Sequence, residues 1–134
     1  MQDIDYMNLA IELARSNPDK ITNKSVGCII VKDNKIIGSG CRTAYQNVLY
    51  KQHKVYHAEH LALMDCYFNC STEQEPAKGA TVFVTSAPCT KRWWNSISYH
   101  FPSCCNLLIK AGIWRAVIGD IDRDFGDGGI KVLQ

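Results

Sequence analysis

The chain has 134 residues and a mass of 15.1 kDa, a length that leaves room for one domain. Its 15 basic and 13 acidic residues give a net charge of +2, and 46% hydrophobic with 21% charged residues is an ordinary globular composition. These values exclude an intrinsically disordered chain and argue against a strongly basic surface for nucleic acids. The unusual feature is the set of seven cysteines, because an odd number cannot pair completely as disulfides.

The N-terminal segment shows no sign of a secretion signal. It carries acidic residues near its start and has no uninterrupted apolar stretch long enough for the core of a signal peptide. No stretch of the chain approaches the ~20 apolar residues that a membrane span needs. We therefore expect a cytoplasmic protein without a membrane partner, in which thiols are reduced and cysteine clusters bind metal more often than they form disulfides.

Hydrophobic periodicity divides the chain into helices and strands. Apolar residues at helical spacing predict a first helix, which Asn17 and Pro18 end. In chain order, the expected elements are helix 4–16, a hairpin of strands 26–31 and 35–41, loop 42–56, helix 57–70, strand 79–86, helix 104–112, strand 113–119 and a turn-rich tail from residue 120. This order predicts an α/β layer structure with a mixed sheet.

Three short features fall where this sheet is expected to meet the starts of helices. His57 opens one helix, Cys89 follows a strand after Pro88, and Cys104 opens the next helix. A histidine nitrogen and two thiolates are natural ligands of Zn²⁺, and three protein ligands leave the fourth tetrahedral position open for water. The pattern therefore predicts one catalytic zinc ion rather than a structural one.

Glu59 stands two residues beyond His57, where its carboxylate can lie beside the metal without binding it. That position suits a proton shuttle between water and a leaving amine. The spacing H-x-E with a later P-C-x-x-C is the pattern of zinc deaminases. Here Arg92 occupies the position of the last cysteine, so the second thiolate must come from farther along the chain.

Several runs of the sequence resemble one family over roughly residues 5–133. They are SVGCIIVKDNKIIGSG, HAEHLAL, GATVFVTSAPC, FPSCCNLLIKAGI and GDGGIKVL. These runs are similar to the deaminase domain of the bifunctional riboflavin-biosynthesis deaminase-reductase, within the zinc-dependent cytidine and deoxycytidylate deaminase-like superfamily. The resemblance implies a three-layer α/β/α sandwich with a central mixed sheet, one zinc-dependent deaminase domain over residues 1–134, and no reductase half.

The resemblance also carries residues over. In the family, the second zinc cysteine stands nine residues before the isoleucine of an Ala-Gly-Ile ending, and nine residues before Ile113 is Cys104. The resemblance thus implies the zinc ligands His57, Cys89 and Cys104, with Glu59 as the proton-transfer residue. Cys105 competes with Cys104, and its alternative role is that of a small buried hydrophobe.

Substrate contacts are expected at two places. Asn23 matches the asparagine that in this family contacts the region of the substrate ring, although it could also brace a turn. The segment between the two zinc cysteines departs from the family pattern, as do Ser86-Ala87 and Lys24. In that segment the candidate substrate-binding residues are Lys91, Arg92, Trp93 and Trp94, which could equally pack against a neighbouring subunit.

The expected reaction is hydrolytic deamination of an aminopyrimidine-type nucleoside, nucleotide or related small molecule, with release of ammonia. One alternative is a deaminase that acts on a base in tRNA or DNA. An alternative of another class is a non-catalytic zinc module whose tetrahedron Cys105 closes. The resemblance further implies a homo-oligomer, and the four cysteines of the predicted strands and helix are expected to be ordinary buried residues: Cys28, Cys41, Cys66 and Cys70.

Overall fold

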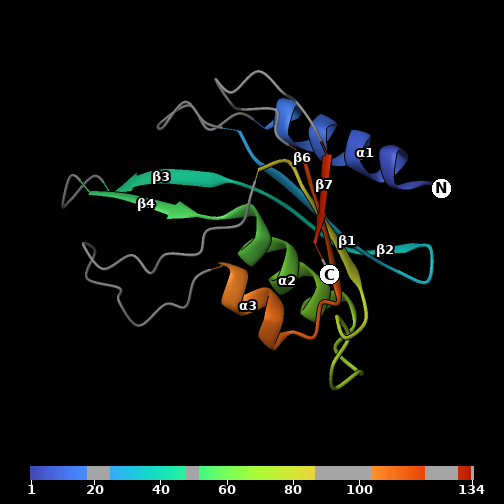
Figure 1. Ribbon diagram of the computed structural model, residues 1–134. Coiled ribbons are helices and arrows are strands. Elements are labelled where there is room, and N and C mark those ends of the chain that lie inside the picture. Colours follow the sequence, from blue (N-terminus) through green and yellow to red (C-terminus); the bar gives the residue numbers. More distant parts are fainter. Residues whose placement is uncertain (18–24, 48–51, 87–103, 120–129, 134) are drawn as a thin grey trace.

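The computed structural model describes residues 1–17, 25–47, 52–86, 104–119 and 130–133 (Figure 1). The elements are α1 (Asp3–Ser16), β1 (Gly27–Lys32), β2 (Lys35–Cys41), β3 (Thr43–Asn47), β4 (Gln52–Tyr56), α2 (Ala58–Asn69), β5 (Thr81–Val84), α3 (Cys104–Lys110), β6 (Arg115–Gly119) and β7 (Ile130–Leu133).

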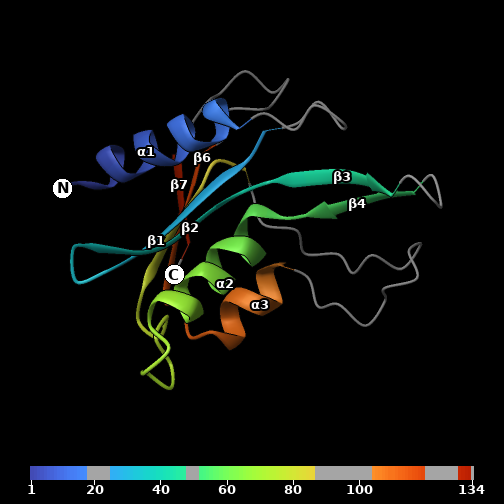
Figure 2. The same ribbon diagram turned by 180° about the vertical axis from the view of Figure 1, so that it is seen from behind.

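Five strands form the central sheet, in the order β2-β1-β5-β6-β7. β5 and β6 run parallel, and every other neighbouring pair is antiparallel, so the sheet is mixed. Helix α1 covers one face, and α2 and α3 lie side by side on the other (Figures 1 and 2). The predicted three-layer α/β/α sandwich is confirmed.

Helix α1 forms where periodicity predicts it. Its buried stripe consists of Tyr6, Met7, Ala10 and Ala14. The helix begins after Gln2, whose backbone N–H donates a 2.8 Å hydrogen bond to the Asp5 carboxylate. It ends at Asn17, whose side-chain amide donates to the Leu13 carbonyl at 3.0 Å.

The hairpin of β1 and β2 turns at Asp33 and Asn34, as expected. Both residues adopt the left-handed conformation, with φ of 53° and 59°. Asp and Asn tolerate this region better than other non-glycine residues, and two such residues in succession form the tight turn that matches the twist of a hairpin. The residue types of the turn therefore determine the register of the two strands as far as Val31, beyond which a β-bulge between Ile30 and Val31 shifts it.

Two segments contain strands that sequence periodicity does not indicate. Residues 42–56 were expected to form a loop, but β3 and β4 pair there as a separate two-stranded sheet, from Thr43 opposite Tyr56 to Asn47 opposite Gln52. This hairpin stands apart from the central sheet (Figure 1), so local pairing stabilises it without an alternating apolar face. The tail, expected to be turn-rich, contains the edge strand β7 paired with β6.

Each face of the central sheet has its own core. Under α1 the buried cluster is built around large side chains, including Tyr6, Met7 and Phe83. Under α2 and α3 many of the buried residues are small, among them Cys28, Ala58, Ala62, Cys66, Ala77 and Ala80. The core under α2 and α3 therefore contains more small side chains than the core under α1.

Candidate active site

The start of α2 presents two of the predicted site residues. His57 follows β4 directly, has an extended backbone with φ −71° and ψ 148°, and is the N-cap of the helix. Its carbonyl accepts a 3.1 Å hydrogen bond from the Leu61 N–H, and its side chain is half-buried. Glu59 lies in the first turn and is only 4% exposed. A carboxylate is rarely buried without a function or a partner, so this position is distinctive.

Two glycines of β2 determine how closely this helix lies on the sheet. A Cβ on Gly40 would lie 2.6 Å from the Ala62 nitrogen and 2.7 Å from the Ala58 oxygen. A Cβ on Gly38 would lie 2.5 Å from the Ala62 oxygen. Because these contacts involve backbone atoms, no rotamer change can relieve them. Because Gly38 and Gly40 have no side chain, α2 lies close to β2, and this close packing sets the distance of Glu59 from the sheet.

Cys28 of β1 lies in electrostatic reach of Glu59 and is fully buried. Burial, followed by the charge of Glu59, holds the pKa of the Cys28 thiol well above its ordinary value. The thiol is therefore neutral, and it adds no second negative charge beside the carboxylate.

The other cysteines whose side chains are described agree in part with the prediction of buried residues. Cys66 is fully buried, whereas Cys41 and Cys70 are half-buried, and all four described cysteines are free. Burial, with a smaller contribution from the neighbouring Cys70, raises the pKa of Cys66 to about 11. Cys66 therefore packs as a small hydrophobe rather than as a reactive group.

Helix α3 begins beside the start of α2. Cys104 is the first residue of α3, as predicted, and the two helices lie side by side with their first turns at the same end of the sheet (Figures 1 and 2). β5 also ends at this edge, where Thr85 pairs with Gly27. The structure thus brings the backbone positions of His57, Glu59 and Cys104 to one edge.

The remaining predicted site residues are not placed. Asn23 and Cys89 lie outside the described residues, as does the segment that contains the four candidate substrate contacts: Lys91, Arg92, Trp93 and Trp94. The side chains of Cys104 and Cys105 also lie outside them. Within the side chains that the structure does describe, no group of three or more His, Cys, Asp or Glu could hold a metal ion, and two of the three predicted ligands are not in that set.

The chemistry of the donor set can still be compared with zinc. A half-buried imidazole at a helix start and two cysteines form the nitrogen and sulfur ligand set that zinc prefers. Glu59 is too deeply buried to be a surface carboxylate, and it stands two residues from His57 in the sequence, which fits a group beside the metal. The residue types of the three predicted ligands therefore fit a zinc ion.

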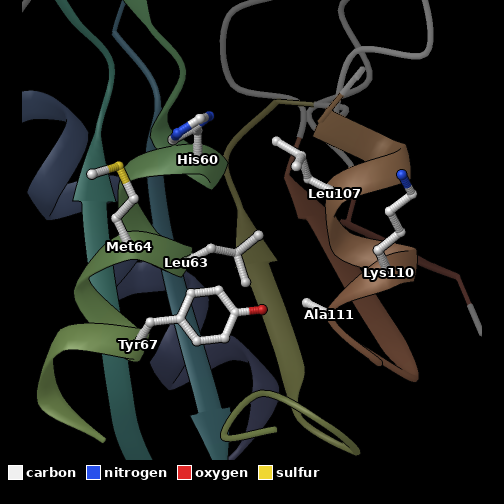
Figure 3. A pocket seen from close by; sticks show the side chains of 7 residues that line it. All are labelled: His60, Leu63, Met64, Tyr67, Leu107, Lys110 and Ala111. Carbon is white, nitrogen blue, oxygen red and sulfur yellow. The ribbon is translucent and has the colours of Figure 1, made fainter. Parts of the chain in front are cut away.

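A hollow of about 180 Å³ lies on the outer side of the same two helices. Its lining residues are His60, Leu63, Met64, Tyr67, Leu107, Lys110 and Ala111 (Figure 3). A metal motif of two histidines would use His60 together with His57. His60 instead lines this hollow and is half-buried. The hollow is mostly apolar and lies on the face of α2 and α3 away from the sheet.

Sequence reasoning missed two contributors to the geometry of this edge. One is the pair Gly38 and Gly40, whose alternation within a strand is a recognisable signal of close backbone approach. The other is Thr85. Threonine is common in strands, so nothing in the sequence indicates a special role for this residue. Both act on the elements that deliver the site residues rather than in the site itself.

None of the helices in the described ranges is long and apolar enough to cross a membrane.

Comparisons with known proteins agree with this arrangement. A family model described as the cytidine and deoxycytidylate deaminase zinc-binding region matches residues 1–120. The chain is 40% identical over 126 residues to the diaminohydroxyphosphoribosylamino-pyrimidine deaminase of Buchnera aphidicola subsp. Acyrthosiphon pisum (strain APS), an alignment that covers 91% of this chain and 69% of that protein.

Longer proteins match over only part of their length. The riboflavin biosynthesis protein RibD of Buchnera aphidicola subsp. Baizongia pistaciae (strain Bp) is 40% identical over 140 residues, which cover 100% of this chain and 31% of that protein. Among solved structures, the diaminohydroxyphosphoribosylaminopyrimidine deaminase/5-amino-6-(5-phosphoribosylamino)uracil reductase of Thermotoga maritima superposes with a TM-score of 0.64 at 30% identity, covering 87% of this chain and 29% of that one. Acinetobacter baumannii RibD gives 0.60 at 34% identity, with coverages of 87% and 27%.

These matches confirm the resemblance drawn from the sequence, and with it the deaminase class of the enzyme and its cytidine deaminase-like fold. The family model extends over most of the chain, including both described site residues and the start of α3. The chain belongs to the zinc-binding cytidine and deoxycytidylate deaminase family.

Proposed function

We propose that residues 1–134 form a single zinc-dependent domain that hydrolytically deaminates an aminopyrimidine, and that His57, Cys89 and Cys104 hold the zinc ion. The observation that carries this proposal is the position of Glu59. Its carboxylate is buried in the first turn of α2, two residues from a half-buried histidine, and that turn lies beside the start of α3 at Cys104. This is the arrangement that a metal-assisted hydrolysis requires of its proton carrier.

When bound, zinc lowers the pKa of a water molecule so that the water becomes a nucleophile near neutral pH. Glu59 accepts the proton that this water loses and delivers it to a ring nitrogen of the substrate. The water oxygen bonds to the ring carbon that carries the exocyclic amine. A second proton, from this oxygen, then passes through Glu59 to the amine. The amine leaves as ammonia, and the ring carbon becomes a carbonyl. Overall, one water is consumed and one amine is exchanged for one oxygen.

The substrate that we propose is a diaminopyrimidine with a phosphoribosylamino group. The support is the name of the Buchnera aphidicola relative at 40% identity, a diaminohydroxyphosphoribosylamino-pyrimidine deaminase of which this chain covers 69%. Asn23 contacts the ring region in this proposal, and Lys91, Arg92, Trp93 and Trp94 supply cations for phosphate and indoles for stacking.

The test measures ammonia release against that pyrimidine, cytidine, deoxycytidylate and guanine. The wild-type enzyme should release ammonia from the first compound, lose activity on treatment with a chelator and regain it with zinc. Glu59→Gln should bind zinc and fold normally but lose activity by about a thousandfold, because general acid–base catalysis is worth roughly 10²- to 10⁴-fold. Glu12→Gln, the same change on the exposed side of α1, is the matched control and should leave the rate unchanged.

Two results would contradict this function. Wild-type turnover by Glu59→Gln on a verified substrate would remove the role of Glu59. Four protein ligands and no water around cobalt substituted for zinc would indicate the non-catalytic module closed by Cys105. Salt-dependent binding of tRNA or DNA, followed by deamination of a base, would replace the small-molecule substrate.

We also propose that the chain assembles as a homo-oligomer through the outer face of α2 and α3. Two large apolar side chains that line the hollow of Figure 3 are exposed, with Met64 at 54% and Tyr67 at 44%. Phe68, the next residue of α2, is 83% exposed. On α2, the spacing of His60, Met64, Tyr67 and Phe68 places them along one stripe. Contiguous exposed apolar residues of this kind mark interaction sites.

Light scattering coupled to gel filtration tests the assembly. The wild-type protein should elute as an oligomer, and Phe68→Glu should shift it to the monomer with its fold intact, because the charge would be buried in the interface. A wild-type monomer at all concentrations would refute the proposal. We place this oligomer in the cytoplasm, a location that the four free cysteines support because thiols are kept reduced there.

A further inference from the structure

Thr85 stands out among the side chains that the structure describes. Among the residues whose side chains are described, Glu59 and Thr85 are the buried ones with a charged or purely polar side chain, and Thr85 is 0% exposed. It comes directly after β5, at the edge of the sheet where α2 and α3 begin. A buried hydroxyl is costly unless it forms a hydrogen bond, so its partner indicates its role.

That partner is the backbone of Gly27, at the start of β1. The Gly27 N–H donates to the Thr85 hydroxyl oxygen at 3.1 Å, and the Thr85 N–H donates to the Gly27 carbonyl at 3.0 Å. In a regular antiparallel pair, the two residues exchange both N–H···O=C bonds. Here the side chain of Thr85 takes the place of its own carbonyl. The chain can therefore leave the sheet after Thr85 while the Gly27 N–H keeps its acceptor.

Gly27 is itself held by the neighbouring elements. A Cβ at this residue would lie 2.2 Å from the Ala10 carbonyl oxygen of α1, so the helix backbone rests directly on the strand. On the other side, the Arg42 N–H donates to the Val26 carbonyl at 2.8 Å, which ties the start of β1 to the end of β2. Thr85 thus bonds to a point whose position both the helix layer and the sheet determine.

In the sequence, predicted site residues stand close to both members of this pair. Asn23 stands four residues before Gly27, and Cys89 stands four residues after Thr85. Because β1 and β5 are antiparallel neighbours, the chain enters β1 and leaves β5 at the same edge of the sheet. The pair of Gly27 and Thr85 therefore joins the start of β1 to the end of β5.

We propose that Thr85 is a positioning residue: its hydroxyl fixes the end of β5, four residues before the predicted ligand Cys89 in the sequence, and zinc binding depends on this hydroxyl. This inference rests on the proposed function for the identity of the ligands, but it concerns a group that touches neither metal nor substrate. Replacing the hydroxyl by a methyl group would leave the Gly27 N–H buried without its acceptor. The Gly27 N–H would regain an acceptor only if the Thr85 carbonyl turned toward β1, and the backbone at the end of β5 would have to move for this.

The experiment compares Thr85→Val, Thr85→Ser and the wild-type protein, with Thr81→Val as the matched control. Valine has the shape of threonine without the hydroxyl, serine keeps the hydroxyl, and Thr81 carries the same change at the opposite end of β5. Zinc affinity of the metal-free proteins is measured by competition with a chelator, well below each unfolding temperature. Amide hydrogen exchange at Gly27 reports whether the hydrogen bond is lost.

Thr85→Val should speed the exchange of the Gly27 amide and weaken zinc binding by about tenfold or more, the size of effect found for groups that orient ligands indirectly. Thr85→Ser should restore most of both, and Thr81→Val should change neither. Zinc affinity within twofold of wild type in Thr85→Val, or no rescue by serine, would overturn the positioning role.

A wild-type protein that binds zinc but deaminates nothing would contradict the proposed reaction and leave the comparison of zinc affinities decisive for Thr85. A wild-type protein that binds no zinc would overturn both proposals, since there would be no metal ligand to position.

Discussion

The two faces of the central sheet hold their helices in different ways. On the α1 face, large side chains interlock, and the rings of Tyr6 and Phe83 lie 5.1 Å apart between centroids. On the α2 face, glycines of β2 let the helix backbone rest directly on the strand. Side chains can change rotamer, but touching backbones cannot adjust without moving a whole element. Among the described residues, the α2 face, which carries the candidate active site, has two such backbone contacts, at Gly38 and Gly40, whereas the α1 face has one, at Gly27.

The α1 face has its own tight point at Gly27, yet it also has an adjustable attachment at the start of the helix. There the Arg115 guanidinium of β6 donates two hydrogen bonds to the Asp3 carboxylate, one of them 2.9 Å long. This pair is partly exposed. Helix α1 thus contributes mainly stability, whereas α2 contributes both stability and the position of Glu59.

Gly40→Ala should break this distinction most strongly. The new Cβ would collide with backbone atoms of Ala58 and Ala62, so α2 would have to move, at a cost of about 3 kcal/mol in the free energy of unfolding. Ammonia release by the folded fraction should also fall by more than about tenfold, since a displacement of roughly 1 Å can cost that much. Urea unfolding and steady-state kinetics measure the two effects.

Gly38→Ala is the matched control for that variant. It strains α2 one turn farther from Glu59, near Ala62 and Cys66, so it should cost similar stability with a smaller loss of rate. Equal losses of rate in both variants would show that α2 moves as one rigid body.

Met7→Ala tests the opposite face. Met7 is almost fully buried, and its side chain covers Gly119 of β6. Truncation should lower the free energy of unfolding by about 2 to 3 kcal/mol through lost burial and a residual cavity. The rate per folded molecule, measured well below the unfolding temperature, should stay within about twofold of wild type. A larger loss of rate would mean that α1 also positions the site.

Thiol labelling tests the α2 side, where both fully buried cysteines among those with described side chains lie. With its pKa raised from 9.0 to about 11, Cys66 has about a hundredfold less thiolate at pH 8 than an ordinary thiol, and burial excludes reagents as well. Mass spectrometry after iodoacetamide treatment should find Cys41 and Cys70 labelled well before Cys28 and Cys66. Simultaneous labelling in the native protein would show that this face opens readily.

Asp3→Asn should have the smallest effect. The hydrogen bond from Arg115 lowers the pKa of Asp3 below its ordinary value of 3.8, so the stabilisation is present above that value and is lost as the pH falls through the folded-state pKa. Because the Asp3 side chain is 43% exposed, the pair is worth about 0.5 kcal/mol. The difference between variant and wild type, measured by urea unfolding, should therefore shrink toward zero below pH 3.8. A constant difference down to the most acidic pH would mean that the charge of Asp3 is not what stabilises.

The sequence predicts helices whose apolar residues repeat at a regular spacing, and turns that few residue types can form. The period of α1 and the Asp33-Asn34 turn place the first helix and hairpin, because one face of each must be buried and few residues adopt the turn conformation. The spacing of His57 and Glu59 places both at the start of α2, where the structure has them. Local chemistry and local geometry agree at each of these points.

Other features depend on partners that sequence periodicity does not reveal. β3 and β4 pair with each other away from the central core, so their residues follow no apolar alternation. β7 is an edge strand that depends on β6 for its pairing. The hydroxyl of Thr85 matters only because Gly27, far away in the sequence, lies opposite it. Each of these requires knowledge of what lies across the sheet.

The tight turn at Asp33 and Asn34 has a practical consequence for experiments on this enzyme. Both residues are exposed, and the turn lies at the end of the β1–β2 hairpin opposite to Gly27 and Gly40. A dye, an affinity tag or a surface tether attached there would extend away from the start of α2. The turn is therefore a suitable attachment point for immobilising or observing the protein, because the opposite edge of the sheet stays accessible to substrate.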